Sequence, residues 1–343
     1  MPDQSVFPRR IQVLWACAGI AVACATLAVR GHVPTNDQLN YVTRGLAFGA
    51  ACATVPPLIE IALGFITRWL CRIDTFICTN RGDAADLFRS ELKPFVSNNT
   101  PYFCGLVFGV AASAITYLYS PHVQPLELEP KIVGIIAIFL ANVLAGAALS
   151  TLFGFARALW RAGNRDDCTV RLSRDTFGVL STGALMLKVW GVALVLWGLY
   201  IVPAVEYGVH GKGDILTFEQ SPVLLSLAIP ALVGILIAFI VCQFPLHRKM
   251  VESKQAMVEH LRGLIDQLTP SKAEDISDEL IRKLQFLETR FGAAQALPEW
   301  PSTMLIALEA FGLSAVSIVL PQVVAPIFRS VVGVLFGIPL PSA

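Results

Sequence analysis

Charged residues are scarce in this sequence: Asp, Glu, Lys and Arg make up 15% of the 343 residues, against about a quarter in soluble domains. Hydrophobic residues make up 55%, and the mean hydropathy is +0.63. So little charge cannot cover a water-soluble surface of this size. The composition therefore excludes disordered proteins, coiled-coil fibres and most soluble enzymes, and it indicates an integral membrane protein.

Motifs for metal binding and catalysis are also absent from the sequence. None of the eight cysteines stands at Cys-x-x-Cys spacing, and there is no His-Glu-x-x-His, Gly-x-Ser-x-Gly or Walker sequence. The cysteines fall in apolar runs or in the basic segments between them, which fits thiols that stay reduced. We therefore expect no enzyme activity, no metal and no cofactor.

Long apolar runs dominate the chain. A helix needs roughly 20 apolar residues to cross the hydrocarbon, and a seventh run from about Ser302 to Leu320 follows six clear ones. The six clear runs are residues 11–29, 46–66, 102–119, 132–155, 177–202 and 223–244. We expect an all-α integral membrane protein, a polytopic bundle of seven transmembrane helices, or eight if residues 321–343 also cross, with a cytoplasmic helical hairpin.

Lysine and arginine are distributed unevenly between the segments that connect these runs. Of the 26 Lys and Arg residues, 20 lie in residues 1–10, 68–100, 156–176 and 245–301, and four lie in the intervening segments. Basic residues accumulate on the cytoplasmic side of membrane proteins. The sequence therefore predicts a multi-pass protein of the plasma (inner) membrane with a cytoplasmic N-terminus.

Hydropathy divides the chain into three parts. Residues 1–245 are the predicted six-helix transmembrane region, residues 246–300 are the one long polar segment, and residues 301–343 hold the seventh helix and an apolar tail. The polar segment carries nine acidic and eight basic residues. Such a balance does not fit a nucleic-acid-binding surface, so we expect no nucleic-acid partner.

Two amphipathic helices are predicted within residues 246–300, because apolar residues recur there at spacings of three and four. Thr269 and Pro270 end the first helix, and Ser271 with Glu274 matches a capping box at the start of the second. We expect an antiparallel hairpin, because in it the apolar stripe of each helix is covered by that of the other. The expected hairpin interface consists of Val258, Leu261, Ile265, Leu268, Leu280, Leu284, Leu287 and Phe291.

The predicted hairpin has two interpretations. It can be self-contained or lie on the other cytoplasmic loops, or it can be an arm that binds a second copy of the chain or a cytoplasmic protein. With the lipid bilayer as the one certain partner, the sequence favours a non-enzymatic assembly or signalling component. The alternative is a cation channel or proton-coupled transporter.

The transport alternative depends on ionisable side chains inside the spans, where each costs at least ~2.5–3.5 kcal/mol. Glu60, Lys188 and Glu309 are of this kind, and the estimated depths allow them to meet in the inner half of the bundle. Such a cluster can pin three helices together, or it can bind a cation or share a proton. Asn142 is a further polar candidate in the fourth span.

Glycine and proline suggest how the helices pack. Gly45 with Gly49, and Gly105 with Gly109, match the small-residue spacing of closely packed membrane helices. Pro56 and Pro57 remove two backbone donors one turn before Glu60, so we expect a kink or break in that helix.

Overall fold

The structure is a computed structural model, and it describes most of the chain. The described residues are 6–71, 77–79, 84–96, 99–119, 126–165, 168–170, 184–195, 229–269, 277–297, 299, 312, 327–328 and 330–338. The expected seventh span therefore lies almost wholly outside the described residues, as do Ser271, Glu274 and Glu309.

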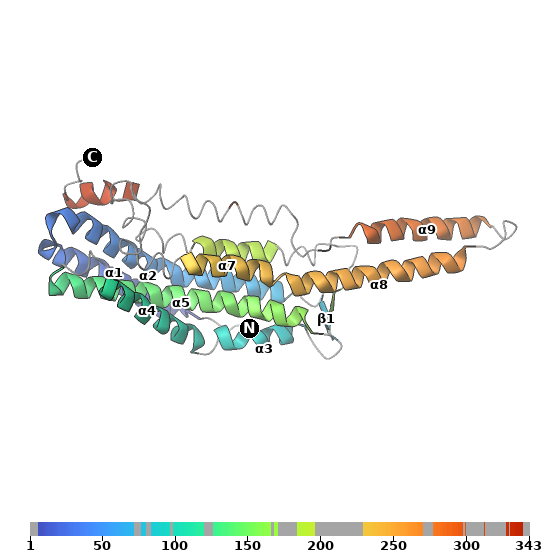
Figure 1. The fold of residues 1–343 in the computed structure, drawn as a ribbon, viewed down its shortest axis with the longest axis horizontal. Helices are drawn as coiled ribbons and strands as arrows, with labels where there is room; N and C mark the ends of the chain where they lie inside the picture. Colours follow the sequence, from blue (N-terminus) through green and yellow to red (C-terminus); the bar gives the residue numbers. More distant parts are fainter. Residues whose placement is uncertain are drawn as a thin grey trace.

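Helices make up almost all of the described structure (Figure 1). The elements are α1 (Arg9–Val29), the 3-10 helix η1 (Arg30–His32), α2 (Thr35–Leu70), β1 (Ile77–Thr79), α3 (Ala84–Val96), α4 (Thr100–Tyr119), α5 (Leu128–Gly163), β2 (Cys168–Val170), α7 (Ile229–Val241), α8 (Phe244–Leu268) and α9 (Asp278–Gln295). A shorter apolar helix covers Ala184–Val195.

Among the described residues, five helical stretches are long and apolar enough to cross a membrane, which agrees with the expected helical membrane class. They are Arg9–His32 (α1 and η1), Asp37–Leu70 (α2), a stretch within Ala85–Leu118 that includes α3 and α4, Leu128–Gly163 (α5) and Pro230–Leu268 (α7 and α8). Both α2 and α5 are longer than the apolar runs that predicted them, at 36 residues each. At 1.5 Å per residue they extend over about 54 Å, well beyond a hydrocarbon layer of ~30 Å.

The outer surface of the bundle is apolar. On α1, Val13, Leu14 and Ile20 are each more than 60% exposed, which water would not tolerate over a contiguous surface. By contrast, α5 buries one side along most of its length. This arrangement leaves α1 and α4 facing lipid and makes α5 the central helix of the bundle.

A row of aromatic rings crosses the core from α3 to α7. Trp69 of α2 lies 5.1 Å from Phe88 of α3 and 6.5 Å from Phe155 of α5, measured between ring centroids. Trp190 continues the row, at 6.1 Å from Phe155 and 5.3 Å from Phe239 of α7. The Trp190 indole N–H also donates to the Ile235 carbonyl at 2.8 Å. These contacts fix the helix Ala184–Val195 against α5 and α7.

Two segments predicted to lie on the same side of the membrane are joined by a short antiparallel ladder. In it, Ile77 pairs with Val170 and Thr79 pairs with Cys168. The ladder lies at the end of the bundle from which α8 departs (Figure 1). We call this the α8 end, and we call the opposite end, where the chain turns at η1, the η1 end.

Glycines lie where two helix pairs approach most closely, which confirms the contacts expected from their spacing. A side chain on Gly49 of α2 would meet the Gly19 carbonyl oxygen of α1 at 2.6 Å, and one on Gly109 of α4 would meet Val143 of α5 at 2.8 Å. Backbone-to-backbone contact of this kind is a main source of helix association in lipid.

Of the expected kink or break at Pro56 and Pro57, the break is wrong, because both residues lie inside the single helix α2. In hydrocarbon, any other path would leave many more backbone groups unpaired than the two donors that proline removes. Thr54, one turn earlier, donates its hydroxyl to the Ala50 carbonyl at 2.9 Å.

Substitutions of two glycines in α2 should have opposite effects on stability. Gly49→Ala forces α1 and α2 apart and should lower thermal stability in detergent, by about 1–3 kcal/mol if the strain resembles core overpacking. Gly64→Ala is the matched control, because nothing lies within 4 Å of its added methyl group. It should stabilise the helix by roughly 0.5–1 kcal/mol. Equal melting shifts for the two variants would contradict the packing account.

Candidate functional site

Glu60 binds the N-terminal segment of the chain. Its Oε1 accepts a hydrogen bond from the Phe7 backbone N–H at 2.7 Å, and the Tyr102 hydroxyl of α4 donates to the Val6 carbonyl. The Phe7 ring packs edge-on against Tyr102, with ring centroids 5.8 Å apart, and Val6 and Phe7 are buried. The N-terminal segment is therefore held between α2 and α4, with the carboxylate occupied by a backbone donor.

Lys188 lies in a different environment. Its side chain is exposed, and its Nζ lies 5.8 Å from the ring of Phe65, which also has the Arg68 guanidinium 5.1 Å away. The described ion pairs do not include one between Glu60 and Lys188. The described residues thus do not bring these two members of the expected charge cluster together, and Glu309 is outside them.

Asn142 is buried near the middle of α5. Its Nδ2 donates to the Ile138 carbonyl, one turn earlier, at 2.7 Å. Thr26, Thr43 and Thr151 donate their hydroxyls to carbonyls of their own helices in the same way, at 2.7–3.0 Å. Most of the described polar side chains in the spans thus satisfy themselves locally.

An apolar pocket with a cavity volume of about 80 Å³ lies among α2, α5, α7 and the helix Ala184–Val195. Its described lining residues include many alanines and no ionisable side chain. Thr151 lines it, and the Thr151 hydroxyl is already bonded to the Ala147 carbonyl. Such a lining suits hydrocarbon chains or a packed helix.

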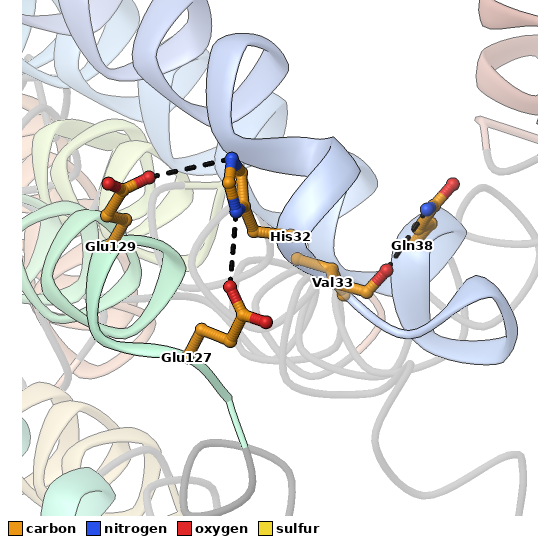
Figure 2. A network of polar contacts seen from close by, with 5 residues as sticks. All are labelled: His32, Val33, Gln38, Glu127 and Glu129. Carbon is orange, nitrogen blue, oxygen red and sulfur yellow. Dashed lines mark hydrogen bonds and ion pairs between the residues drawn. The ribbon is translucent and has the colours of Figure 1, made fainter.

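A polar cluster at the η1 end links η1 to the start of α5 (Figure 2). His32 Nδ1 lies 3.1 Å from Glu127 Oε2, and His32 Nε2 lies 3.7 Å from Glu129 Oε2. The neighbouring turn is fixed by Gln38, whose Nε2 donates to the Val33 carbonyl at 3.0 Å. Sequence reasoning missed this cluster, although Glu127 and Glu129 are close neighbours in a segment predicted to share a side with His32.

The chemical capacity of this cluster is small. The three side chains are 53–67% exposed, so ion pairs here contribute at most about 1 kcal/mol. Within the described ranges, no group of three or more His, Cys, Asp or Glu side chains is arranged to hold a metal ion. The cluster is best understood as a surface tie between η1 and α5.

The helices α8 and α9 lie side by side and extend away from the bundle (Figure 1). Of the eight residues expected at their interface, Leu261 is buried and the other seven are partly buried. The α9 helix begins at Asp278, where the Ser277 hydroxyl accepts from the Leu280 N–H at 3.2 Å. The cap found here is therefore Ser277, six residues after the expected Ser271.

A polar clamp closes the base of this helix pair. Lys254 Nζ of α8 lies 2.9 Å from Glu299 Oε1 and donates to the Leu297 carbonyl at 3.1 Å. His247 Nδ1 lies 2.7 Å from the Glu299 carbonyl oxygen. The hydrogen bond from Lys254 lowers the pKa of Glu299, just as Lys283 lowers the pKa of Glu279 on the surface of α9. These contacts hold Leu297 and Glu299, which follow α9, against α8.

Comparison with known proteins does not assign this arrangement to a family: no family model, curated protein or solved structure matches the chain. The function must therefore be inferred from the chain itself.

Two substitutions of Glu60 should separate a structural role from transport. Glu60→Gln keeps an oxygen acceptor for the Phe7 N–H and should leave thermal stability nearly unchanged. Glu60→Ala leaves that buried donor unpaired and should cost about 1–3 kcal/mol. If the Glu60 charge is required for cation or proton flux into liposomes, both variants should lose that flux. Flux that is present in the wild type and absent in Glu60→Gln would contradict the structural assignment.

The clamp predicts a pH dependence at the base of α9. Because the folded pKa of Glu299 lies below its ordinary value of 4.5, the stabilisation is complete above pH 4.5 and is lost as the pH falls below it. The protection factors of residues 294–297 in hydrogen exchange, which correct for the intrinsic pH dependence of exchange, should therefore fall on acidification. Lys254→Gln should abolish that fall in protection, whereas Lys283→Gln, whose partner lies within α9, should preserve it.

Proposed function

We propose that this chain is a non-enzymatic membrane protein that acts in assembly or signalling through the helix pair α8–α9. The observation that carries the proposal is the continuity between membrane and arm. The helical path from Pro230 to Leu268 extends over 39 residues, with a turn at Cys242 and Gln243, and its second half leaves the bundle (Figure 1). A shift of α7 within the membrane would therefore move α8.

The proposed topology puts the helix pair in the cytoplasm and the chain in the plasma (inner) membrane. It rests on the basic residues: Arg68 lies in the last turn of α2 and Arg161 in that of α5, both at the α8 end. The helix α1 begins with Arg9 in the same half of the bundle, near the level of Glu60. The N-terminus is then cytoplasmic as well.

Two anchored segments support a seventh crossing. Glu299 is held by His247 and Lys254 at the base of α8. At the η1 end, Arg30 Nη1 donates to the Phe336 carbonyl at 3.3 Å. These contacts hold Glu299 and Phe336 at opposite ends of the bundle. We propose one crossing between them, which gives seven spans and leaves the C-terminal helix, residues 330–336, on the non-cytoplasmic side.

The surface of α9 fits a contact with a second copy of the chain. Phe286 is 59% exposed and Ile281 is 41% exposed, and the Arg290 guanidinium lies 5.1 Å from the Phe286 ring. Aromatic residues and arginine are enriched at protein interfaces. All copies in one membrane share an orientation, so their arms lie on the same side. The charges in residues 245–301 are nearly balanced, so the repulsion between two arms is small.

Deleting residues 251–292 tests whether the arm holds an assembly together. The full chain in mild detergent should have the mass of an oligomer by light scattering, and the deletion should reduce it to the mass of one copy. An unchanged mass would contradict the proposal. So would a wild-type protein that is monomeric both in detergent and after cross-linking in the membrane.

Point variants keep the arm folded and sharpen the test. Phe286→Glu with Ile281→Glu removes the exposed apolar contacts of α9 and should dissociate the oligomer at least tenfold more readily, as expected for the loss of an aromatic hot spot. Gln285→Glu adds a charge to an exposed position of the same helix and is the matched control. Equal dissociation of the control and the double variant would mean that the contact lies elsewhere.

A further inference from the structure

A second pocket, lined by both charged and apolar side chains, opens at the η1 end, between α1, α2 and α5. Its charged lining residues are Asp37, Arg44 and Lys131. The Tyr41 hydroxyl also lines it and donates to the Pro130 carbonyl at 3.0 Å, which holds α2 level with the start of α5. The pocket is therefore built between two helices that are fixed in register.

The side-chain amide of Asn40 lines this pocket. Asn40 is 9% exposed, and within the described part of the chain no hydrogen-bond donor reaches its Oδ1. Leaving a buried acceptor unpaired costs ~1–3 kcal/mol. Because Asn40 lines the pocket, a bound molecule with an N–H or O–H group is the economical way to satisfy this oxygen.

The charges of the pocket are ordered along the membrane normal. Arg44 and Lys131 stand directly before the apolar runs that begin at residues 46 and 132, so both lie at the boundary of the hydrocarbon. Asn40 lies about one helical turn further out and Asp37 about two turns. The two basic side chains thus lie at the membrane boundary, and the Asn40 amide oxygen and the Asp37 carboxylate lie outside it.

The inner wall of the pocket is apolar. Phe48, Ala137 and Ile138 line it, and Phe48 lies one turn deeper in the membrane than Arg44. A ligand that fits all three levels has an apolar tail, a phosphate at the boundary and a donor group with positive charge beyond it.

We propose that this pocket binds an ammonium-bearing phosphate ester, the headgroup of an aminophospholipid such as phosphatidylethanolamine. Its phosphate lies near Arg44 and Lys131, and its primary ammonium donates to Asn40 Oδ1 and faces Asp37. An ammonium has donors and no acceptor, which matches an amide oxygen and a carboxylate. The two-carbon link between phosphate and ammonium covers about the rise of one helical turn.

The choice of lipids provides a sharp test. Phosphatidylethanolamine and phosphatidylcholine share the phosphate and the positive charge, but the quaternary ammonium of the latter has no N–H. Native mass spectrometry of the delipidated full chain, titrated with each lipid, should show about tenfold tighter retention of phosphatidylethanolamine, the range expected for a hydrogen bond to a charged group. Equal retention of the two lipids would overturn the proposal.

Variants assign the preference to the pocket. Asn40→Leu removes the unpaired oxygen, so the fold should be no less stable, and the preference for phosphatidylethanolamine should disappear. Asn40→Asp keeps an acceptor and should retain the preference. Arg44→Gln should weaken the binding of both lipids, whereas Arg68→Gln, at the other end of α2, should change neither. A preference that persists in Asn40→Leu would refute the assignment to this pocket.

Soluble compounds distinguish a membrane lipid from a free ligand. Phosphoethanolamine and glycerophosphoethanolamine carry the same charged groups without acyl chains. If they raise the melting temperature of the wild type but not of Asn40→Leu at millimolar concentration, the pocket accepts the free ester. If only the lipid does so, the apolar wall is part of the recognition. If neither the lipid nor the soluble esters act, the proposal fails.

Discussion

Every polar group that enters hydrocarbon must find its partner inside the protein, and the rest of this structure follows from that constraint. The described spans meet it mostly within single helices: threonine hydroxyls and the Asn142 amide donate to carbonyls one turn earlier. Association between helices then depends largely on shape, with a few interhelical hydrogen bonds such as those from Tyr41 and Trp190. Glycines let α1 approach α2 and α4 approach α5, and the aromatic row joins α2, α3, α5 and α7.

The same constraint determines what Glu60 does. A carboxylate in a span usually signals transport chemistry, because its burial is costly. Here the Phe7 N–H, which has no place in a helix, supplies the donor, and Lys188 is directed to the Phe65 ring. Each charge is satisfied separately, so neither requires the other. The apolar pocket among α2, α5 and α7 has no ionisable lining residue among those described.

Sequence periodicity and hydropathy were sufficient for the membrane class and for the approximate positions of five long helices, since apolar length is a one-dimensional property. Periodicity and hydropathy could not predict the full length of α2, because its first turns are polar and hydropathy detects only apolar runs. Nor could they anticipate that Glu60 would be paired with a backbone group 53 residues away. The pairing of His32 with Glu127 could not be predicted either, because the turns that bring these residues together have no periodic sequence pattern.

The two proposed binding surfaces lie where the constraint is relaxed. Beyond the hydrocarbon, water can satisfy polar groups, so side chains are free to remain without protein partners and to select a ligand. Phe286 on α9 is exposed in the polar part of the chain, and Asn40 lines a pocket at the membrane boundary. The two surfaces lie toward opposite ends of a bundle whose long helices α2 and α5 are packed together. A headgroup bound between α2 and α5 at the η1 end would contact the same two helices that help to form the core at the α8 end. Lipid composition would then influence the arm through helix packing, with no charge inside the hydrocarbon required.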